Sequence, residues 1–211
     1  MFAEIPELFL SIIVCPRMQQ FESIRFLGWE RYSDIEGYIR NMRFNDFSDS
    51  QPFDKYNQKV NEIVAMDAIQ GANHTQFGKE MILRELHKAC CAFATSGSEW
   101  LKVNPSWNED EDAAKPVATG FWGCGIFESD KQLKVIIQWL AASMCGRPSI
   151  DIHVFSPDDQ SIETEFNERI APLLSKSPKV GSIARALVED FAKIRRETKM
   201  TVFDFIVKQL E

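Results

Sequence analysis

Three glycines and three aromatic residues share the segment of this sequence that is best suited to approach a phosphate. The segment, residues 117–127, is Val-Ala-Thr-Gly-Phe-Trp-Gly-Cys-Gly-Ile-Phe. An apolar stretch ending at Thr119 predicts a strand before the glycines, and Ser129-Asp130-Lys131-Gln132 has the Ser-x-x-Gln form of a capping box, which predicts a helix after them. A helix N-terminus favours an anion through its unpaired N–H groups and positive dipole end. Glycine lets the backbone come within hydrogen-bonding distance of a diphosphate.

Two common phosphate motifs do not fit these glycines. No Gly-Lys-Ser/Thr follows them and their order is not Gly-x-Gly-x-x-Gly, which excludes a P-loop and a Rossmann fingerprint. From the spacing alone, a tight turn without a ligand is an equally good interpretation.

The segment resembles the diphosphate loop and following helix of the poly(ADP-ribose) glycohydrolases. The similarity covers most of the chain, in the family's order and at similar spacing, and includes residues 62–68, 84–91, 130–142 and 201–202. It implies an α/β fold of the macrodomain type that binds ADP-ribose or poly(ADP-ribose). It also implies a family activity, which is the hydrolysis of ribose–ribose O-glycosidic bonds in poly(ADP-ribose).

The resemblance further implies which residues face the substrate. The family places the phenylalanine matching Phe127 beside the ribose next to the cleaved bond, and the aromatic residue matching Phe155 near the adenine. Burial in the core is the alternative for Trp122 and Phe127, because large aromatic residues are mostly buried. The expected substrate-binding residues are Phe121, Trp122, Gly123, Cys124, Gly125, Ile126, Phe127, Phe155 and Ile35.

Several positions depart from the family pattern. Phe121 replaces an asparagine, and Ile35 replaces the middle tyrosine of a segment that covers the adenosine. Glu128 and Ser129 replace two glycines, and Glu128 would place a carboxylate close to a bound diphosphate. These changes fit a divergent member of the family. We expect Gly123 and Gly125 to be intolerant of side chains.

The family's catalytic signature, a triple glycine followed by Gln-Glu-Glu, does not occur in this sequence. The first glycine is Gly28, and no two glutamates are adjacent. Glu22 follows two glutamines, but in the family a Pro-Glu-Leu helix comes after the catalytic glutamates, whereas here residues 6–8 come before Glu22. We therefore expect no catalytic residue in the chain, and we interpret residues 1–211 as one domain, the C-terminal part of a glycohydrolase-like catalytic domain.

Three functions are compatible with the sequence. The first is a poly(ADP-ribose) glycohydrolase whose catalytic loop lies in a missing N-terminal segment, so that the chain alone is inactive, because glycosidic cleavage needs a positioned carboxylic acid. The second is a non-catalytic module that binds ADP-ribose. The third is a degenerate family member that no longer binds.

The composition of the chain argues against several kinds of binding site and cellular location. The net charge of −7 argues against nucleic-acid binding. Five cysteines and three scattered histidines show no metal-ligand spacing, so we expect neither a metal site nor a cofactor. The odd number of cysteines and the lack of a cleavable leader indicate a reducing compartment, which we take to be the nucleus or cytoplasm. No apolar run approaches the roughly 20 residues that span a membrane.

Strands that alternate with helices predict a layered α/β fold. The family resemblance implies, more specifically, a macrodomain-like mixed sheet flanked by helices, lacking its N-terminal portion and carrying extra C-terminal helices. The apolar run over residues 8–15 predicts a buried helix rather than a signal peptide. Cys90 and Cys91 fall on a predicted helix whose spacing favours core or half-buried positions over reactive ones. The predicted helices lie near 6–14, 77–94, 129–145, 160–174, 181–197 and 201–210, the strands near 22–28, 59–69, 115–119 and 149–155, and the irregular segments over 40–56 and 97–114.

Overall fold

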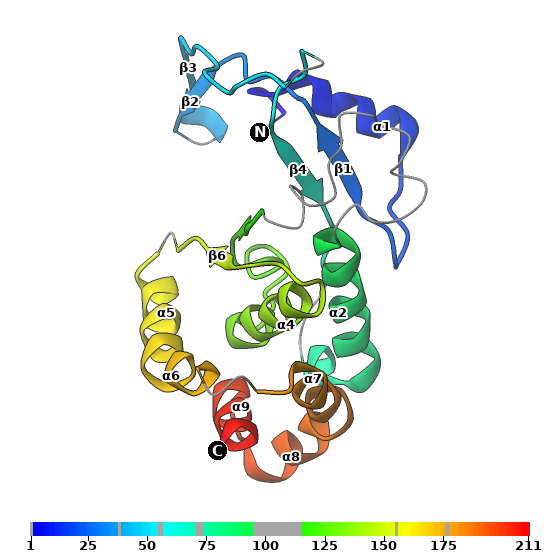
Figure 1. Cartoon of the computed structure of the whole chain (residues 1–211), viewed down its shortest axis with the longest axis vertical. Coiled ribbons are helices and arrows are strands. Elements are labelled where there is room, and N and C mark those ends of the chain that lie inside the picture. Colours follow the sequence, from blue (N-terminus) through cyan, green and yellow to red (C-terminus); the bar gives the residue numbers. More distant parts are fainter. Residues whose placement is uncertain are drawn as a thin grey trace.

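The computed structural model describes residues 2–37, 39–54, 57–70, 74–94, 115–154, 156–175 and 178–211. Strands dominate the first part of the chain and helices the second, as Figure 1 shows. The strands are β1 (Ile24–Leu27), β2 (Asp34–Glu36), β3 (Arg43–Asn45), β4 (Glu62–Ala65), β5 (Val117–Thr119) and β6 (Ile150–Ile152). The longer helices are α2 (Lys79–Phe93), α4 (Lys131–Met144), α5 (Pro157–Arg169), α7 (Val180–Glu189), α8 (Phe191–Thr198) and α9 (Val202–Leu210). The short helical segments are η1 (Pro6–Phe9), α1 (Leu10–Val14), η2 (Ile39–Asn41), η3 (His74–Phe77) and α6 (Ala171–Leu174).

Among the described residues the strands form three separate pairs. β1 pairs antiparallel with β4, β2 pairs antiparallel with β3, and β5 pairs parallel with β6. Parallel strands need a long crossover connection, and α4 supplies it between β5 and β6. The predicted mixed α/β class with C-terminal helices is therefore confirmed, and the β5–α4–β6 unit fixes where the glycine-rich turn lies.

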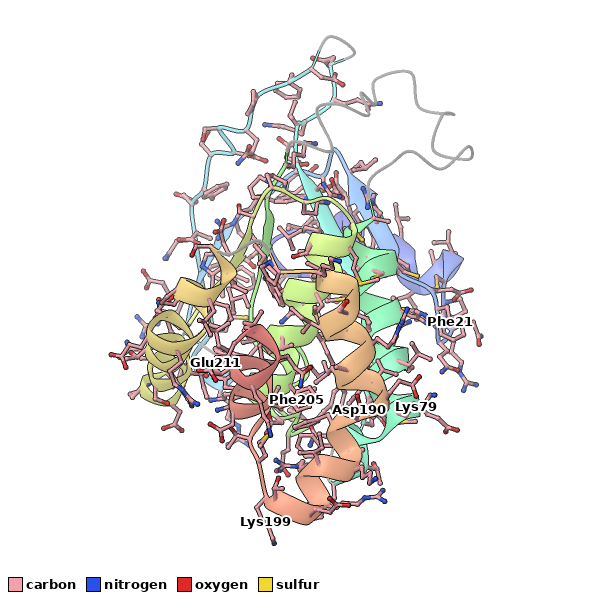
Figure 2. All side chains as sticks on the ribbon, turned by 60° about the horizontal axis from the view of Figure 1, so that its bottom comes forward. Phe21, Lys79, Asp190, Lys199, Phe205 and Glu211 are labelled. Carbon is pink, nitrogen blue, oxygen red and sulfur yellow. The ribbon has the colours of Figure 1, made fainter. Side chains whose placement is uncertain are left out.

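The hydrophobic core surrounds α4. In Figure 1 this helix lies at the centre, with α2, α5, α7 and α9 around it. Because neighbours cover it on several sides, its apolar residues are not confined to one stripe, and Val135, Ile136 and Ile137 are all buried in succession. Figure 2 views the end that carries α7, α8 and α9, where Phe205 lies beside Phe191 with ring centroids 5.1 Å apart. No helix of the described residues is long and apolar enough to cross a membrane.

Three local predictions are wrong. The segment predicted as one buried helix over 6–14 starts as a 3-10 turn and leaves Ile13 and Val14 exposed, because no described element packs over this face. Residues 40–56, predicted to be irregular, include β3, which closes a hairpin with β2. Cys90 is half-buried as predicted, whereas Cys91 is exposed. The acidic segment over 97–114 lies outside the described residues.

Candidate functional site

The glycine-rich segment forms two consecutive tight turns between β5 and α4. In the first, the Cys124 N–H donates to the Phe121 carbonyl at 3.0 Å, and in the second the Glu128 N–H donates to the Gly125 carbonyl at 3.0 Å. Gly123 has a φ of +78° and is the third residue of the first turn, the position where a type II turn requires glycine. The backbone geometry of the turn therefore depends on Gly123.

Gly123 and Gly125 have opposite surroundings. A Cβ atom on Gly123 would lie 2.7 Å from the Ala68 side chain and 3.2 Å from the Lys134 ammonium, whereas a Cβ on Gly125 would meet nothing within 4 Å. The predicted intolerance of side chains is thus built into the fold at Gly123. At Gly125 the fold itself has room, so the prediction for that residue concerns only a ligand.

The tip of the turn offers backbone donors. Gly125 is exposed, and Ile126 is 94% exposed. The N–H groups of Gly125, Ile126 and Phe127 have no hydrogen-bond partner among the described residues. Three successive unpaired donors on a tight turn are suited to an anion with several oxygens.

The start of α4 differs from the prediction. The helix begins at Lys131 and its N-cap is Asp130, whose carboxylate accepts from the Leu133 N–H at 2.9 Å. The predicted Ser-x-x-Gln capping box is therefore wrong. The hydroxyl of Ser129 is instead buried beside Gly123. A side-chain carboxylate already occupies the N-terminus of α4, so an anion at this site would depend on the donors of the turn tip.

The inner side of the turn rests on a buried ion pair. The Lys134 ammonium lies 3.8 Å from the centre of the Trp122 ring and pairs with Glu85 of α2. Glu85 is 3% exposed and Lys134 2% exposed. Burial and the nearby Arg84 lower the pKa of Lys134, whereas contact with Glu85 favours its charged form. In this structure Trp122 packs on the support of the turn, and its contact with a substrate stays a prediction.

The ionic cluster continues along α2. Arg84 pairs with Glu85 and, at 2.6 Å, with Asp67, which follows β4. The Lys88 ammonium lies 2.7 Å from the Asp67 carboxylate and donates to the Gln19 and Glu22 carbonyls at 2.5 and 2.6 Å. Burial raises the pKa of Asp67, but the hydrogen bonds from Lys88 and Arg84 outweigh it and hold that pKa below its usual range. The buried charges are thus all paired, as the cost of desolvation requires.

Two buried glutamines hold the ends of the turn. Gln138 of α4 is fully buried, contacts the Thr119 hydroxyl at 2.8 Å and donates to the Gly120 carbonyl at 3.1 Å. At the other end, the Asp130 N–H donates to the Gln76 side chain at 2.7 Å. Both ends of the turn are therefore tied to helices of the core.

Phe121, Cys124 and Phe127 of the turn differ in their surroundings. Phe121 lies 5.5 Å from the Lys131 ammonium and lines a hollow of about 500 Å³ together with Trp139, Ile152 and Phe166. Burial raises the pKa of Cys124 to about 12, so its sulfur is a protonated thiol at neutral pH. Phe127 is half-buried.

Two expected site residues lie apart from the turn. Ile35 is in β2, opposite Phe44 of β3, and Figure 1 shows this hairpin at the upper left, away from α4. Phe155 lies outside the described residues. The structure therefore brings together residues 121–127 of the expected site and leaves Ile35 in a separate element.

The glutamates nearest the chain's start are held in their own surroundings. Glu4 pairs with Arg31 at 2.7 Å, the Glu7 carboxylate accepts from the Glu30 N–H at 2.8 Å, and the Glu22 carboxylate accepts from the Gln19 N–H at 2.7 Å. Glu128 is exposed and has a φ of +52°. In the part of the chain that the structure describes, no three His, Cys, Asp or Glu residues are grouped so that they could hold a metal ion.

Sequence reasoning missed Glu85, Lys134 and Gln138 as supports of the turn. One sequence pattern could have predicted such supports, namely a polar residue at a helix position whose neighbours on the same face are apolar. Lys134 shares a face of α4 with Ile137 and Ala141, three and seven positions further on, and both are buried. A long charged side chain on such a face indicates a buried partner.

We expect the two glycines to respond differently to alanine. Gly123→Ala should destabilise the protein by about 1–3 kcal/mol, because it adds a clash with Ala68 to an unfavourable positive φ. Gly125→Ala, the matched control, should change the free energy of unfolding by less than about 0.5 kcal/mol. Urea denaturation of both variants measures this, and equal effects would contradict the turn geometry.

The Glu85–Lys134 pair should behave as a coupled unit. Lys134→Met leaves a buried carboxylate short of one partner and should cost about 3–5 kcal/mol in the free energy of unfolding. Glu85→Leu should cost a similar amount, but the double variant should lose much less than the sum. A double-mutant cycle in urea tests this, and strictly additive losses would show that the two side chains do not interact.

Comparisons with known proteins identify the family of this chain. The model of a family described as poly(ADP-ribose) glycohydrolase, macro domain fold, matches residues 1–163. The chain is 28% identical to probable poly(ADP-ribose) glycohydrolase 2 of Arabidopsis thaliana, with 97% of this chain and 44% of that protein aligned. It is 26% identical to poly(ADP-ribose) glycohydrolase 1 of the same plant and 26% identical to poly(ADP-ribose) glycohydrolase 1 of Caenorhabditis elegans, over 97% of this chain in each case.

These alignments cover 47% of the Arabidopsis and 26% of the Caenorhabditis glycohydrolase 1. The chain thus spans less than half the length of each of these relatives. Since the family match extends over most of its length and includes both β5 and α4, the chain belongs to the poly(ADP-ribose) glycohydrolase family.

Proposed function

We propose that this chain recognises ADP-ribose, free or at the end of poly(ADP-ribose), through the turn between β5 and α4. The observation that carries the proposal is the group of three unpaired N–H donors at Gly125, Ile126 and Phe127, with open space above Gly125. A diphosphate presents several acceptor oxygens to such a turn. Membership of the glycohydrolase family supports ADP-ribose as the source of that diphosphate.

The rigid support of the turn favours binding. Trp122 and Gly123 rest on the Lys134 ammonium, and Gln138 holds Gly120. Donors that are already in place lose little conformational entropy when a ligand arrives. The half-buried Phe127 would then offer an aromatic surface to the ribose, as the family resemblance implies.

The charges around the turn limit the affinity. Asp130 caps α4, Glu128 is exposed beside the tip, and the neighbouring Lys131 is paired with Asp159 of α5 at 2.7 Å. The protein as a whole carries a charge of −7. Uncharged backbone donors must therefore supply most of the attraction for a diphosphate.

Hydrolysis of the polymer needs an additional group. The leaving oxygen must be protonated by a positioned acid, and this step contributes about 10²–10⁴-fold to the rate. Glu4, Glu7 and Glu22 are each engaged near the N-terminal segment. We propose that a carboxylic acid outside these 211 residues completes the catalytic site. We also propose the nucleus or cytoplasm as the protein's location, because an odd number of cysteines is typical of a reducing compartment.

A titration with ADP-ribose tests the binding site. Gly125→Val should abolish binding while the fold is retained, because its branched side chain would fill the space over the turn donors, where a Cβ atom meets nothing within 4 Å. Isothermal titration calorimetry gives the affinity, and circular dichroism checks the fold. Unchanged affinity in Gly125→Val would overturn the proposed site.

Glu128→Gly should have the opposite effect on affinity in the same titration. It removes a carboxylate near the expected diphosphate and relieves a positive φ that glycine adopts freely. Binding should tighten by up to about fivefold, since a screened charge contributes about 1 kcal/mol or less. Weaker binding would show that Glu128 contributes to recognition.

A cleavage assay separates recognition from catalysis. The 211-residue chain should release no ADP-ribose from poly(ADP-ribose) above background, even where it binds the product. A version extended upstream through any triple-glycine and Gln-Glu-Glu segment should release it. Robust turnover by the 211-residue chain would require an acid within it, and Glu22 and Glu128 would be the first residues to replace.

A further inference from the structure

Two cysteines meet where α2 and α4 end side by side. Cys90 lies in the last turn of α2, and Cys145 is the C-cap residue of α4. The Cys145 sulfur lies 3.5 Å from the Cys90 carbonyl oxygen, which places the two cysteines next to each other. Both residues are half-buried rather than enclosed in the core.

The two sulfurs differ in acidity. The hydrogen bond from Cys90 stabilises a Cys145 thiolate, and Arg147 adds a positive charge, so that the pKa of Cys145 falls to about 7 although burial opposes this. The same hydrogen bond raises the pKa of Cys90, which keeps its proton. Arg147 is held nearby, since its guanidinium donates to the Phe93 and Ala94 carbonyls at 2.7 and 3.1 Å. A thiolate with a protonated thiol next to it is the arrangement in which one sulfur is oxidised and the other resolves it.

We propose that Cys145 and Cys90 form a reversible disulfide when a hydroperoxide oxidises Cys145. In the first step the Cys145 sulfur attacks the peroxide, the O–O bond breaks, and a sulfenic acid forms on Cys145 while water leaves. In the second step the Cys90 sulfur attacks that of Cys145, the S–O bond breaks, and the hydroxyl leaves with the Cys90 proton as a second water. Two thiols and one hydrogen peroxide thus give one disulfide and two waters.

The disulfide would join residues 55 positions apart in the sequence. It would connect the C-terminal ends of α2 and α4, the helices that carry Glu85 and Lys134 beneath the turn. Because the cross-link constrains the unfolded chain, the oxidised protein should melt at a higher temperature than the reduced one. The proposal does not depend on ADP-ribose binding.

The other cysteines are natural controls. Cys91 follows Cys90 on α2, but adjacent residues of a helix point about 100° apart, and Cys91 is exposed to solvent. Burial raises the pKa of Cys124 to about 12, which suppresses its thiolate. Cys15 lies just after α1, distant in sequence from both helices.

Peptide mapping without reductant tests the proposal on the whole chain. After brief treatment with hydrogen peroxide and trypsin, the peptide that begins after Lys88 and ends at Lys102 should be cross-linked to the one that begins after Lys134 and ends at Arg169. The first peptide holds both Cys90 and Cys91, so variants decide between them. Cys91→Ser should keep the cross-link, and Cys90→Ser and Cys145→Ser should lose it. Dithiothreitol should reverse it in the wild-type protein.

A second measurement tests whether Cys145 is oxidised before Cys90 reacts with it. Cys90→Ser should leave a sulfenic acid on Cys145 that dimedone traps, and Cys145 should react about tenfold or more faster than Cys124, because the thiolate is the reactive form. A cross-link that survives Cys90→Ser, or one that involves Cys15 or Cys124 at the same rate, would overturn the proposal. So would equal melting temperatures for the oxidised and reduced protein.

Discussion

The structure depends on one buried carboxylate that must be neutralised. Glu85 lies inside the protein between Arg84 of its own helix and Lys134 of α4, and both cations are needed there because an unpaired buried charge costs several kcal/mol. This requirement fixes α2 against α4 and places an ammonium group beneath Trp122. Through Asp67 and Lys88 the same cluster reaches the end of β4 and the segment before β1. A single electrostatic constraint thus aligns the two central helices, the turn and the first strand pair.

The fold was predictable where hydrophobic periodicity is strong. The helices α2, α4 and α9 begin and end within a few residues of their predicted bounds, because each buries an apolar face in one shared core. The single helix predicted near 181–197 is instead divided at Asp190 into α7 and α8. The failures occur where local sequence does not contain the deciding contact. Whether Ile13 is buried depends on what packs over it. The β2–β3 hairpin is stabilised by cross-strand pairing, which the sequence pattern of short, polar segments does not predict.

The candidate site was predictable in place but only partly in detail. The position of the turn follows from the glycines and from the strand and helix on either side of it. The different roles of Gly123 and Gly125 do not, because the first is decided by Ala68, which is distant in sequence. The N-cap was misassigned by one residue, since Ser129 and Asp130 are both good capping residues and only tertiary packing selects between them.

The use of Asp130 as the helix cap has a consequence for how this turn could hold an anion. With the end of α4 already occupied and no free cation beside the tip among the described side chains that contact the turn, an anion would be held by uncharged amides. Such association displaces few counterions and gains little from long-range attraction by a protein of negative charge. Association of an anion with this turn would therefore be slow, and its affinity would depend little on ionic strength. Proteins that bind polyanions through lysine and arginine show a strong salt dependence instead.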